Sequence, residues 1–204
     1  MSDTMITAHA TLASLAFVGL FPIGGILIRI ANFTGLVWVH AAVQALAYLI
    51  YIAAFGIGVY MATNMNYITN AHPIIGIVLF IVLFAQPVLG LLHHRLFKKY
   101  QHRTFWSYAH IGIGRIAILL GIINGGLGLR LARAGTSSKI AYAVVAAVMG
   151  LAYLAAIIWG EVKRRRAASS TGNRPANVKG ERPPRYSSEP SEQEMDYYGP
   201  NRAK

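Results

Sequence analysis

The chain has 204 residues, of which 55% are hydrophobic and only 13% are charged, and its mean hydropathy is +0.45. This composition is too apolar for a soluble domain of this size and is typical of a small multi-span membrane protein. The absence of cysteine excludes disulfides, thiolate nucleophiles, cysteine-ligated iron–sulfur clusters and cysteine-based zinc sites. The net charge of +12 lies mainly in connections and the C-terminal region, so we interpret it as a membrane-topology pattern and expect no nucleic-acid partner.

Five apolar segments are long enough to cross a bilayer, whose hydrocarbon core of roughly 30 Å needs about 20 helical residues. Helices are expected because backbone polar groups in lipid must be satisfied within each segment. The first segment lacks a short apolar core followed by a small-residue cleavage site, so we expect a retained span and not a signal peptide. The segments cover residues 7–28, 36–61, 73–92, 105–129 and 140–160.

The predicted fold class is therefore an all-α membrane protein with five transmembrane helices, the first four forming a cofactor-binding bundle. Residues 1–162 would make up this transmembrane domain. After "EVKRRR" the chain becomes rich in Ser, Pro, Gly, Asn and charged residues, with few large aliphatic side chains. Because such a composition cannot bury a core, residues 163–204 are predicted to form a disordered, basic and polar tail.

Basic residues in the connections predict the orientation. One side of the membrane would carry nine Lys and Arg residues and the other side three. By the positive-inside rule the side with nine is cytoplasmic, which places the N-terminus outside and the C-terminal tail inside. The nine are Arg29, Arg95, Lys98, Lys99, Arg103 and residues 163–166, and the three are Arg130, Arg133 and Lys139.

Four of the seven histidines fall one per span, each near the N-terminal end of spans one to four. Consecutive spans run in opposite directions, so His9 and His72 enter from the outer face, while His40 and His110 enter from the cytoplasmic face. The sequence thus predicts two imidazoles at similar depth on each side of the membrane. The other three lie in the basic connection after the third span, where we expect solvated loop residues: His93, His94 and His102.

Two facing imidazoles at each of two depths favour bis-histidine haem ligation, in which one iron takes a nitrogen from each of two helices. A porphyrin also needs room, so a small residue one turn after a ligand supports this interpretation. That position holds Ala13 after His9, and glycine after the histidines of the third and fourth spans. After His40 it holds Gln44, which is a candidate hydrogen-bond partner at the site.

Other interpretations remain open. A single intramembrane histidine is more often an interhelical hydrogen-bond partner or an interface anchor, which would make the chain a haem-free membrane scaffold or interaction protein. A zinc site would gather three or four ligands at one depth, commonly with a carboxylate. No Asp or Glu occurs between Asp3 and Glu161, which disfavours a transporter, a carboxylate proton relay or a hydrolase with paired carboxylates.

Four stretches within residues 7–130 carry a family resemblance: "AHATLASLAFVGLFPIGGILIR", "WVHAAVQALAYLIYIAAFGIGVYM", "AHPIIGIVLFIVLFAQPVLGLLHHR" and "WSYAHIGIGRIAILLGIINGGLGL". They are similar to the membrane module of the cytochrome b561 family, in the form found in fungal proteins and often joined to an extracellular DOMON haem domain. The histidine intervals of 31, 32 and 38 residues also resemble those of the family. We expect no DOMON domain ahead of the first span, so the resemblance leaves the immediate electron partner open.

The resemblance implies two haem b groups, with His9 and His72 on the outer haem and His40 and His110 on the cytoplasmic haem. This pairing agrees with the one that span direction alone predicts. The implied function is transmembrane electron transfer from a cytosolic, ascorbate-like reductant to an extracytoplasmic acceptor. That acceptor would be monodehydroascorbate, a ferric chelate or a partner redox protein, and the chain would act as an ascorbate- or ferric-reductase-like oxidoreductase, alone or as a homodimer.

Further cofactor-binding candidates are polar residues within the apolar spans. Arg115 lies five positions after His110, and since no carboxylate occurs within the first four spans, we expect a haem propionate to pair with it. Arg29 closes the first span and would either serve the cytoplasmic haem or anchor the helix. Asn124 would bond a propionate or a ring substituent on the outer side.

The basic connection "HHRLFKKYQHR" is usually a topology feature only. In a functional interpretation, Lys98, Lys99 and Arg103 would attract an anionic reductant and form its binding site. On the outer face, Arg130 and Arg133 would meet an anionic acceptor or, alternatively, interact with the C-terminal end of the fourth helix.

Overall fold

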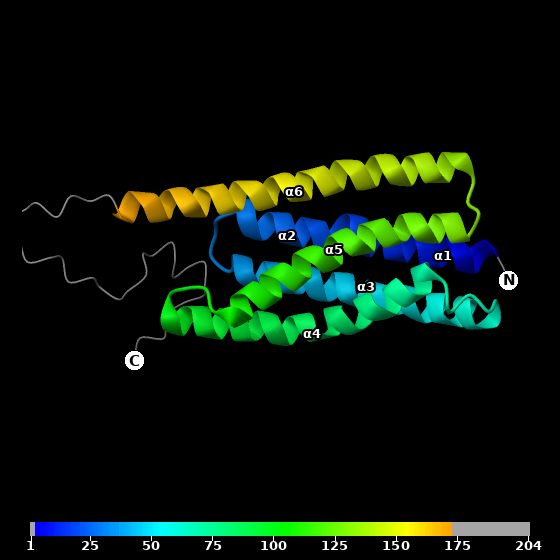
Figure 1. The fold of residues 1–204 in the computed structure, drawn as a ribbon, viewed down its shortest axis with the longest axis horizontal. Coiled ribbons are helices and arrows are strands. Elements are labelled where there is room, and N and C mark those ends of the chain that lie inside the picture. Colours follow the sequence, from blue (N-terminus) through cyan, green and yellow to red (C-terminus); the bar gives the residue numbers. More distant parts are fainter. Residues whose placement is uncertain (1–2, 173–204) are drawn as a thin grey trace, which may run out of the picture.

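The computed structural model describes residues 3–172, which form helices joined by short connections (Figure 1). Five helical rods in this part of the chain are long and apolar enough to cross a membrane, which confirms the predicted fold class. The first rod is built from three consecutive pieces. In chain order the elements are α1 (Asp3–Ser14), η1 (Leu15–Leu20), α2 (Phe21–Ile30), α3 (Leu36–Asn64), α4 (Ala71–Tyr100), α5 (Phe105–Leu131) and α6 (Thr136–Gly172).

The helices extend beyond the apolar stretches that predict them. The clearest case is α6, which continues to Gly172, so residues 163–172 are helical although we expected them in the tail. Lys, Arg and Ala in this segment are good helix formers, and a helix can continue into water after leaving the bilayer. The remainder of the predicted tail, residues 173–204, lies outside the described residues.

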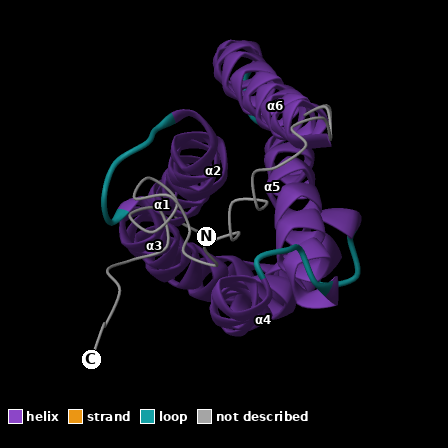
Figure 2. Ribbon diagram, turned by 90° about the vertical axis from the view of Figure 1, so that its left-hand side faces the viewer, coloured by secondary structure: helices purple, strands orange, loops and turns teal. Residues whose placement is uncertain are grey.

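The first four rods pack in a closed ring. The α1–η1–α2 rod contacts α3, α3 contacts α4, α4 contacts α5, and α5 returns to α1. The direction alternates from one rod to the next, as in an up-down-up-down four-helix bundle. In the end-on view of Figure 2, α6 lies outside this ring, where it packs on α2 and α5. Rods one and three are therefore diagonal partners, and so are α3 and α5.

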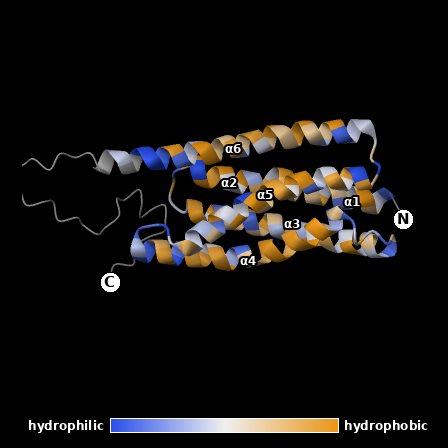
Figure 3. Cartoon of the chain, in the orientation of Figure 1, coloured by the Kyte–Doolittle hydropathy of each residue, from blue (hydrophilic) through white to orange (hydrophobic). Residues whose placement is uncertain are grey.

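Large apolar side chains cover the outer surface of the bundle. In Figure 3 the hydrophobic colour runs along most of each helix, and hydrophilic residues concentrate near the ends. Trp38, Phe84, Ile116 and Leu151 are each more than 60% exposed, although they lie within the spans. Exposure on this scale is expected where lipid and not water surrounds the helices.

A small apolar core separates the two ends of the bundle. It includes Phe17, Tyr51, Leu79 and Ile118. The π-helical turn η1 lies at this level, and its residues Ala16, Phe17 and Val18 are all buried. A π-helical turn accommodates an extra residue and reorients the side chains around it. Here it accompanies the insertion of Phe17 into the middle of the bundle.

Glycines on α5 and α2 accept large side chains from neighbouring helices. A Cβ built on Gly121 would overlap Cδ1 of Phe17. A Cβ on Gly125 would overlap the hydroxyl of Tyr142, and one on Gly25 would lie 2.6 Å from the Tyr153 ring. Tyr142 also donates a hydrogen bond to the Ile122 carbonyl at 2.6 Å. The contacts of Tyr142 and Tyr153 attach α6 to the four-rod bundle.

We predict that Gly121→Ala destabilises the protein, because its methyl group would overlap the buried Phe17 ring. Overpacking of this kind typically costs about 1–3 kcal/mol. The measurement is thermal unfolding of the purified protein in detergent, followed by circular dichroism. Gly126→Ala is the matched control on the same helix, since a Cβ there meets no atom within 4 Å. Equal midpoints for the two variants would contradict the packing described for Phe17.

Candidate functional site

The structure brings His9 and His72 together near the end of the bundle where α1 begins; we call this end outer and the opposite end inner, after the orientation that the basic connections predict. Their ring centroids lie 5.8 Å apart and the ring planes are nearly perpendicular, at 87°. The two side chains come from diagonal rods, His9 from α1 and His72 from the start of α4. These are the two histidines that span direction places at the same depth.

A second pair forms near the other end, where His40 of α3 faces His110 of α5. Their centroids are 6.5 Å apart and their planes again meet at 87°. Two imidazoles that share one metal ion have centroids roughly 6–6.5 Å apart, given metal–nitrogen bonds of about 2.0–2.1 Å. Both pairs have close to the spacing that a common axial metal requires. Within the described residues no group of three or more His, Cys, Asp or Glu side chains has metal-binding geometry.

Hydrogen bonds orient three of the four rings. Nδ1 of His9 lies 2.8 Å from the Ala54 carbonyl oxygen, Nδ1 of His40 lies 2.9 Å from that of Gly24, and Nδ1 of His72 lies 3.0 Å from that of Asn124. A carbonyl only accepts, so Nδ1 carries the hydrogen in each ring and Nε2 keeps its lone pair. This tautomer is the one needed for metal ligation through Nε2.

Glycine makes these interhelical contacts possible. The His9 ring lies against Gly58, four residues after the carbonyl that it binds, and a Cβ on Gly58 would be 2.7 Å from Cε1 of His9. The His72 ring lies in the same way against Gly128, four residues after Asn124, at 2.8 Å. His110 lies against Gly90 of α4, where a Cβ would be 3.0 Å from its ring. A larger residue at these positions would push the imidazole away.

A cavity of about 440 Å³ surrounds the outer pair. Its size falls within the roughly 300–1,000 Å³ range of small-molecule and cofactor sites. Small residues form much of the wall, among them Ala13, Gly58, Gly76 and Gly128, and Phe17 and Tyr51 close it toward the middle of the bundle. Two of the small residues that follow candidate ligands by one turn, Ala13 and Gly76, therefore line this space.

Asn124 and Gln44 have partners in the protein itself. Asn124 Oδ1 lies 3.2 Å from His72 Nδ1, and its Nδ2 donates to the His72 backbone carbonyl at 3.2 Å. Asn124 thus positions His72, a role that differs from the expected bond to a cofactor substituent. Gln44 donates to the Phe21 carbonyl at 3.2 Å and packs against Gly24, whose own carbonyl binds His40.

The sequence interpretation was wrong about the location of His93 and His94, which lie in α4 and not in a loop. His93 is half-buried, its Nδ1 lies 2.8 Å from Oγ of the fully buried Ser107, and its ring stacks on His110 at 5.9 Å and 19°. His93 therefore supports the inner pair from the side. His102 does lie exposed in the connection, as expected.

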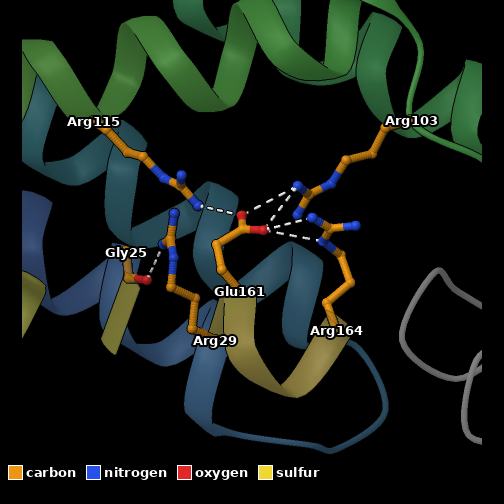
Figure 4. A network of polar contacts seen from close by, with 6 residues as sticks. All are labelled: Gly25, Arg29, Arg103, Arg115, Glu161 and Arg164. Atoms are coloured by element: carbon orange, nitrogen blue, oxygen red, sulfur yellow. Dashed lines mark hydrogen bonds and ion pairs between the residues drawn. The ribbon is translucent and has the colours of Figure 1, made fainter. Parts of the chain in front are cut away.

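The expectation that Arg115 has no carboxylate within reach was also wrong. Glu161 of α6 accepts a hydrogen bond from Arg115 at 2.9 Å, from Arg103 at 3.1 Å and from Arg164 at 2.8 Å (Figure 4). The sequence separation of 46 residues between Arg115 and Glu161 hides this pairing. Arg29 lies beside the group; it donates to the Gly25 carbonyl and its guanidinium carbon is 5.8 Å from the centre of the Tyr153 ring.

The three basic residues expected at a substrate site do not share one environment. Lys98 and Lys99 lie exposed in the last turn of α4, and Lys99 Nζ is 5.2 Å from the centre of the Tyr100 ring. Arg103, in contrast, is bound to Glu161. The two lysines are accordingly better placed than Arg103 to meet a soluble anion.

Comparison with curated proteins identifies several related sequences from Arabidopsis thaliana, each named a cytochrome b561 and DOMON domain-containing protein. One is 32% identical over 156 residues, which is 75% of this chain and 39% of the relative. A second is 32% identical over 143 residues, or 67% of this chain and 30% of the relative, and a third is 31% identical over 116 residues. The chain thus spans less than half the length of these relatives. No family model matches the chain, and no solved structure matches it.

We predict that Ser107→Ala lowers stability by about 1–2 kcal/mol. The Ser107 hydroxyl accepts from the Thr104 N–H at 3.1 Å at the start of α5 and also binds His93, so its loss removes a helix cap and leaves a half-buried imidazole nitrogen unpaired. Thermal unfolding measures the loss, with Ser137→Ala, an exposed position at the start of α6, as the control. Equal stability of the two variants would show that the Ser107–His93 contact is dispensable.

Proposed function

The chain is related to the cytochrome b561 family, and from this premise we propose that it transfers electrons across a membrane through two b-type haems. His9 and His72 hold the outer haem, and His40 and His110 hold the inner one. Each bound haem supplies one-electron chemistry through its Fe³⁺/Fe²⁺ couple.

The observation that carries this proposal is the pairing of imidazoles at two levels, with Nδ1 engaged on a neighbouring helix in three of the four rings. A histidine whose only role was to join helices would not need a second imidazole opposite it. Here each ring has such a partner on the diagonal rod, and the bond at Nδ1 directs Nε2 to ligation. Paired bis-histidine sites are the arrangement that six-coordinate haem iron uses in helical bundles.

The rest of each site also fits a haem. The outer cavity is walled by small residues and lies between the two ligands. At the inner level, the buried side-chain nitrogens without a hydrogen-bond partner among the described residues include Nε of Arg115 and Nε2 of Gln86. Gln86 lies beside Gly114, one turn after His110. Arg115 therefore retains a donor for a propionate carboxylate while it binds Glu161.

Buried apolar and aromatic side chains fill the space between the two histidine pairs and exclude water from it. Phe17, Tyr51 and Leu79 fill this region and are each at most 5% exposed. Phe55 and Phe80 stack beside them with centroids 4.0 Å apart. Close packing here holds the two sites at a fixed separation and excludes water from the space between them.

The direction that we propose runs from a cytosolic, ascorbate-like donor to an extracytoplasmic acceptor such as monodehydroascorbate, a ferric chelate or a redox partner domain. The α4 end, with Lys98 and Lys99, would face the cytoplasm and attract an anionic donor. Arg133, which lines the outer cavity, would face an anionic acceptor. Electron flow follows the potentials of whatever lies on each side.

We predict that the protein purified in detergent, from cells supplied with haem, contains about two haems per chain with a sharp low-spin α band at about 560 nm on reduction. His72→Ala and His40→Ala should each remove one haem. A visible spectrum with a pyridine haemochrome assay measures the stoichiometry, and His102→Ala, in the exposed connection, is the control. A folded but colourless protein would favour a haem-free scaffold instead.

Gly128→Ala should weaken haem binding at the outer site selectively, because the added Cβ would lie 2.8 Å from Cε1 and 3.1 Å from Nδ1 of His72. We expect occupancy of the outer site to fall below half while the inner site stays filled. The haem-to-protein ratio and reductive titration measure the two sites separately. Gly112→Ala on the same helix, where a Cβ meets nothing within 4 Å, should leave both sites unchanged. Full outer occupancy in Gly128→Ala would show that the ring tolerates displacement.

A further inference from the structure

One end of the bundle carries a charged group that the other end lacks. Three arginines bind the Glu161 carboxylate, Arg103, Arg115 and Arg164 (Figure 4), and the side chain of a fourth, Arg29, packs against Gly160, the residue before Glu161. We call the four arginines and Glu161 the arginine cluster; its formal charge is +3. Around the outer cavity the described lining includes a single arginine, Arg133, and no carboxylate.

The arginine cluster is partly withdrawn from water. The side chains of Glu161 and Arg103 are each 23% exposed and that of Arg115 is 25% exposed, whereas Arg164 is 48% exposed. Charges in such a setting interact over longer distances than charges in bulk water, because the surrounding protein and lipid screen them weakly. The cluster therefore exerts a field on whatever lies beside it.

The inner histidine pair lies beside it. Arg115 follows His110 by five positions on α5, which is roughly 7.5 Å of helix rise. Arg29 donates to the Gly25 carbonyl, next in the chain to the Gly24 carbonyl that binds His40. Arg103 lies four residues before Ser107, which binds His93, and the His93 ring stacks on His110. The residues of the cluster thus approach the inner pair from α2, α5 and the connection before α5.

We propose that Glu161 sets the reduction potential of the inner haem and thereby separates it from that of the outer haem, an inference that rests on the proposed function. Reduction adds one electron and hence one negative charge at the iron. The arginines favour that reduced state, and the Glu161 carboxylate opposes them and favours the oxidised state. A fifth helix outside the haem-ligating ring would then control electron entry by contributing a single carboxylate.

Glu161→Gln tests this proposal because it removes the charge while keeping the size of the side chain. We expect the equilibrium constant for electron sharing between the haems to shift about tenfold toward the inner haem, which corresponds to about 59 mV for a one-electron couple. The measurement is a spectroelectrochemical titration of the two-haem protein in detergent. Asp3→Asn removes the other acidic residue of the described chain and should leave the equilibrium unchanged.

Glu161 also attaches α6 to the bundle, so a structural effect needs its own control. Ala146→Leu disturbs the packing of α6 at a buried position without any change of charge. It should lower the unfolding midpoint and leave the inner potential where it is. If Ala146→Leu moves the inner potential as far as Glu161→Gln does, the shift reflects loosening of α6 and the proposal is wrong.

Arg164→Gln gives an independent test should Glu161→Gln fail to fold. It removes the most exposed arginine of the cluster, so the carboxylate becomes less neutralised and the inner potential should fall, in the opposite direction to Glu161→Gln. If both variants bind two haems and the reduction potential of the inner haem is the same as in the wild type, this inference is wrong while the proposed function stands. A wild-type protein that binds no haem would overturn the proposed function itself.

Discussion

Hydrogen bonds from imidazole rings to backbone carbonyls of neighbouring helices are the interaction on which the site depends. His9 binds a carbonyl of α3 and His40 binds one of α2, so each of the first two rods holds a ring from the other. Because the carbonyls are helical and fixed, the rings cannot turn freely. Each bond also selects the tautomer that leaves Nε2 available, so one contact provides both packing and the chemistry of a ligand.

The same arrangement occurs twice in the bundle. His9 of α1 packs on α3 and His72 of α4 packs on α5. Each ring binds a carbonyl four residues before a glycine and lies over that glycine. The two ends differ in charge, since Glu161 and four arginines gather only at the inner end of the described chain. The two ligand pairs have similar geometry but different surrounding charges. This difference is a physical basis for different reduction potentials at the two sites.

Much of this could be predicted from the sequence, because membrane helices restrict the possibilities strongly. Span direction alone pairs His9 with His72 and His40 with His110, and the structure brings both pairs together. The end of α4 could not be predicted in the same way. Hydropathy falls where the chain leaves lipid, whereas the helix continues for two more turns, and His93 on those turns reaches the inner pair. The partner of Arg115 also depends on how α6 packs, which no local pattern encodes.

We expect one iron to lie between the imidazoles of each pair, and a structure of the haem-loaded protein by electron cryomicroscopy would show its position. Two porphyrins should be visible, one ligated by His9 and His72 and the other by His40 and His110, with the arginine cluster beside the second. Iron bound by His93 in place of His110, or a porphyrin seated away from both pairs, would contradict this expectation.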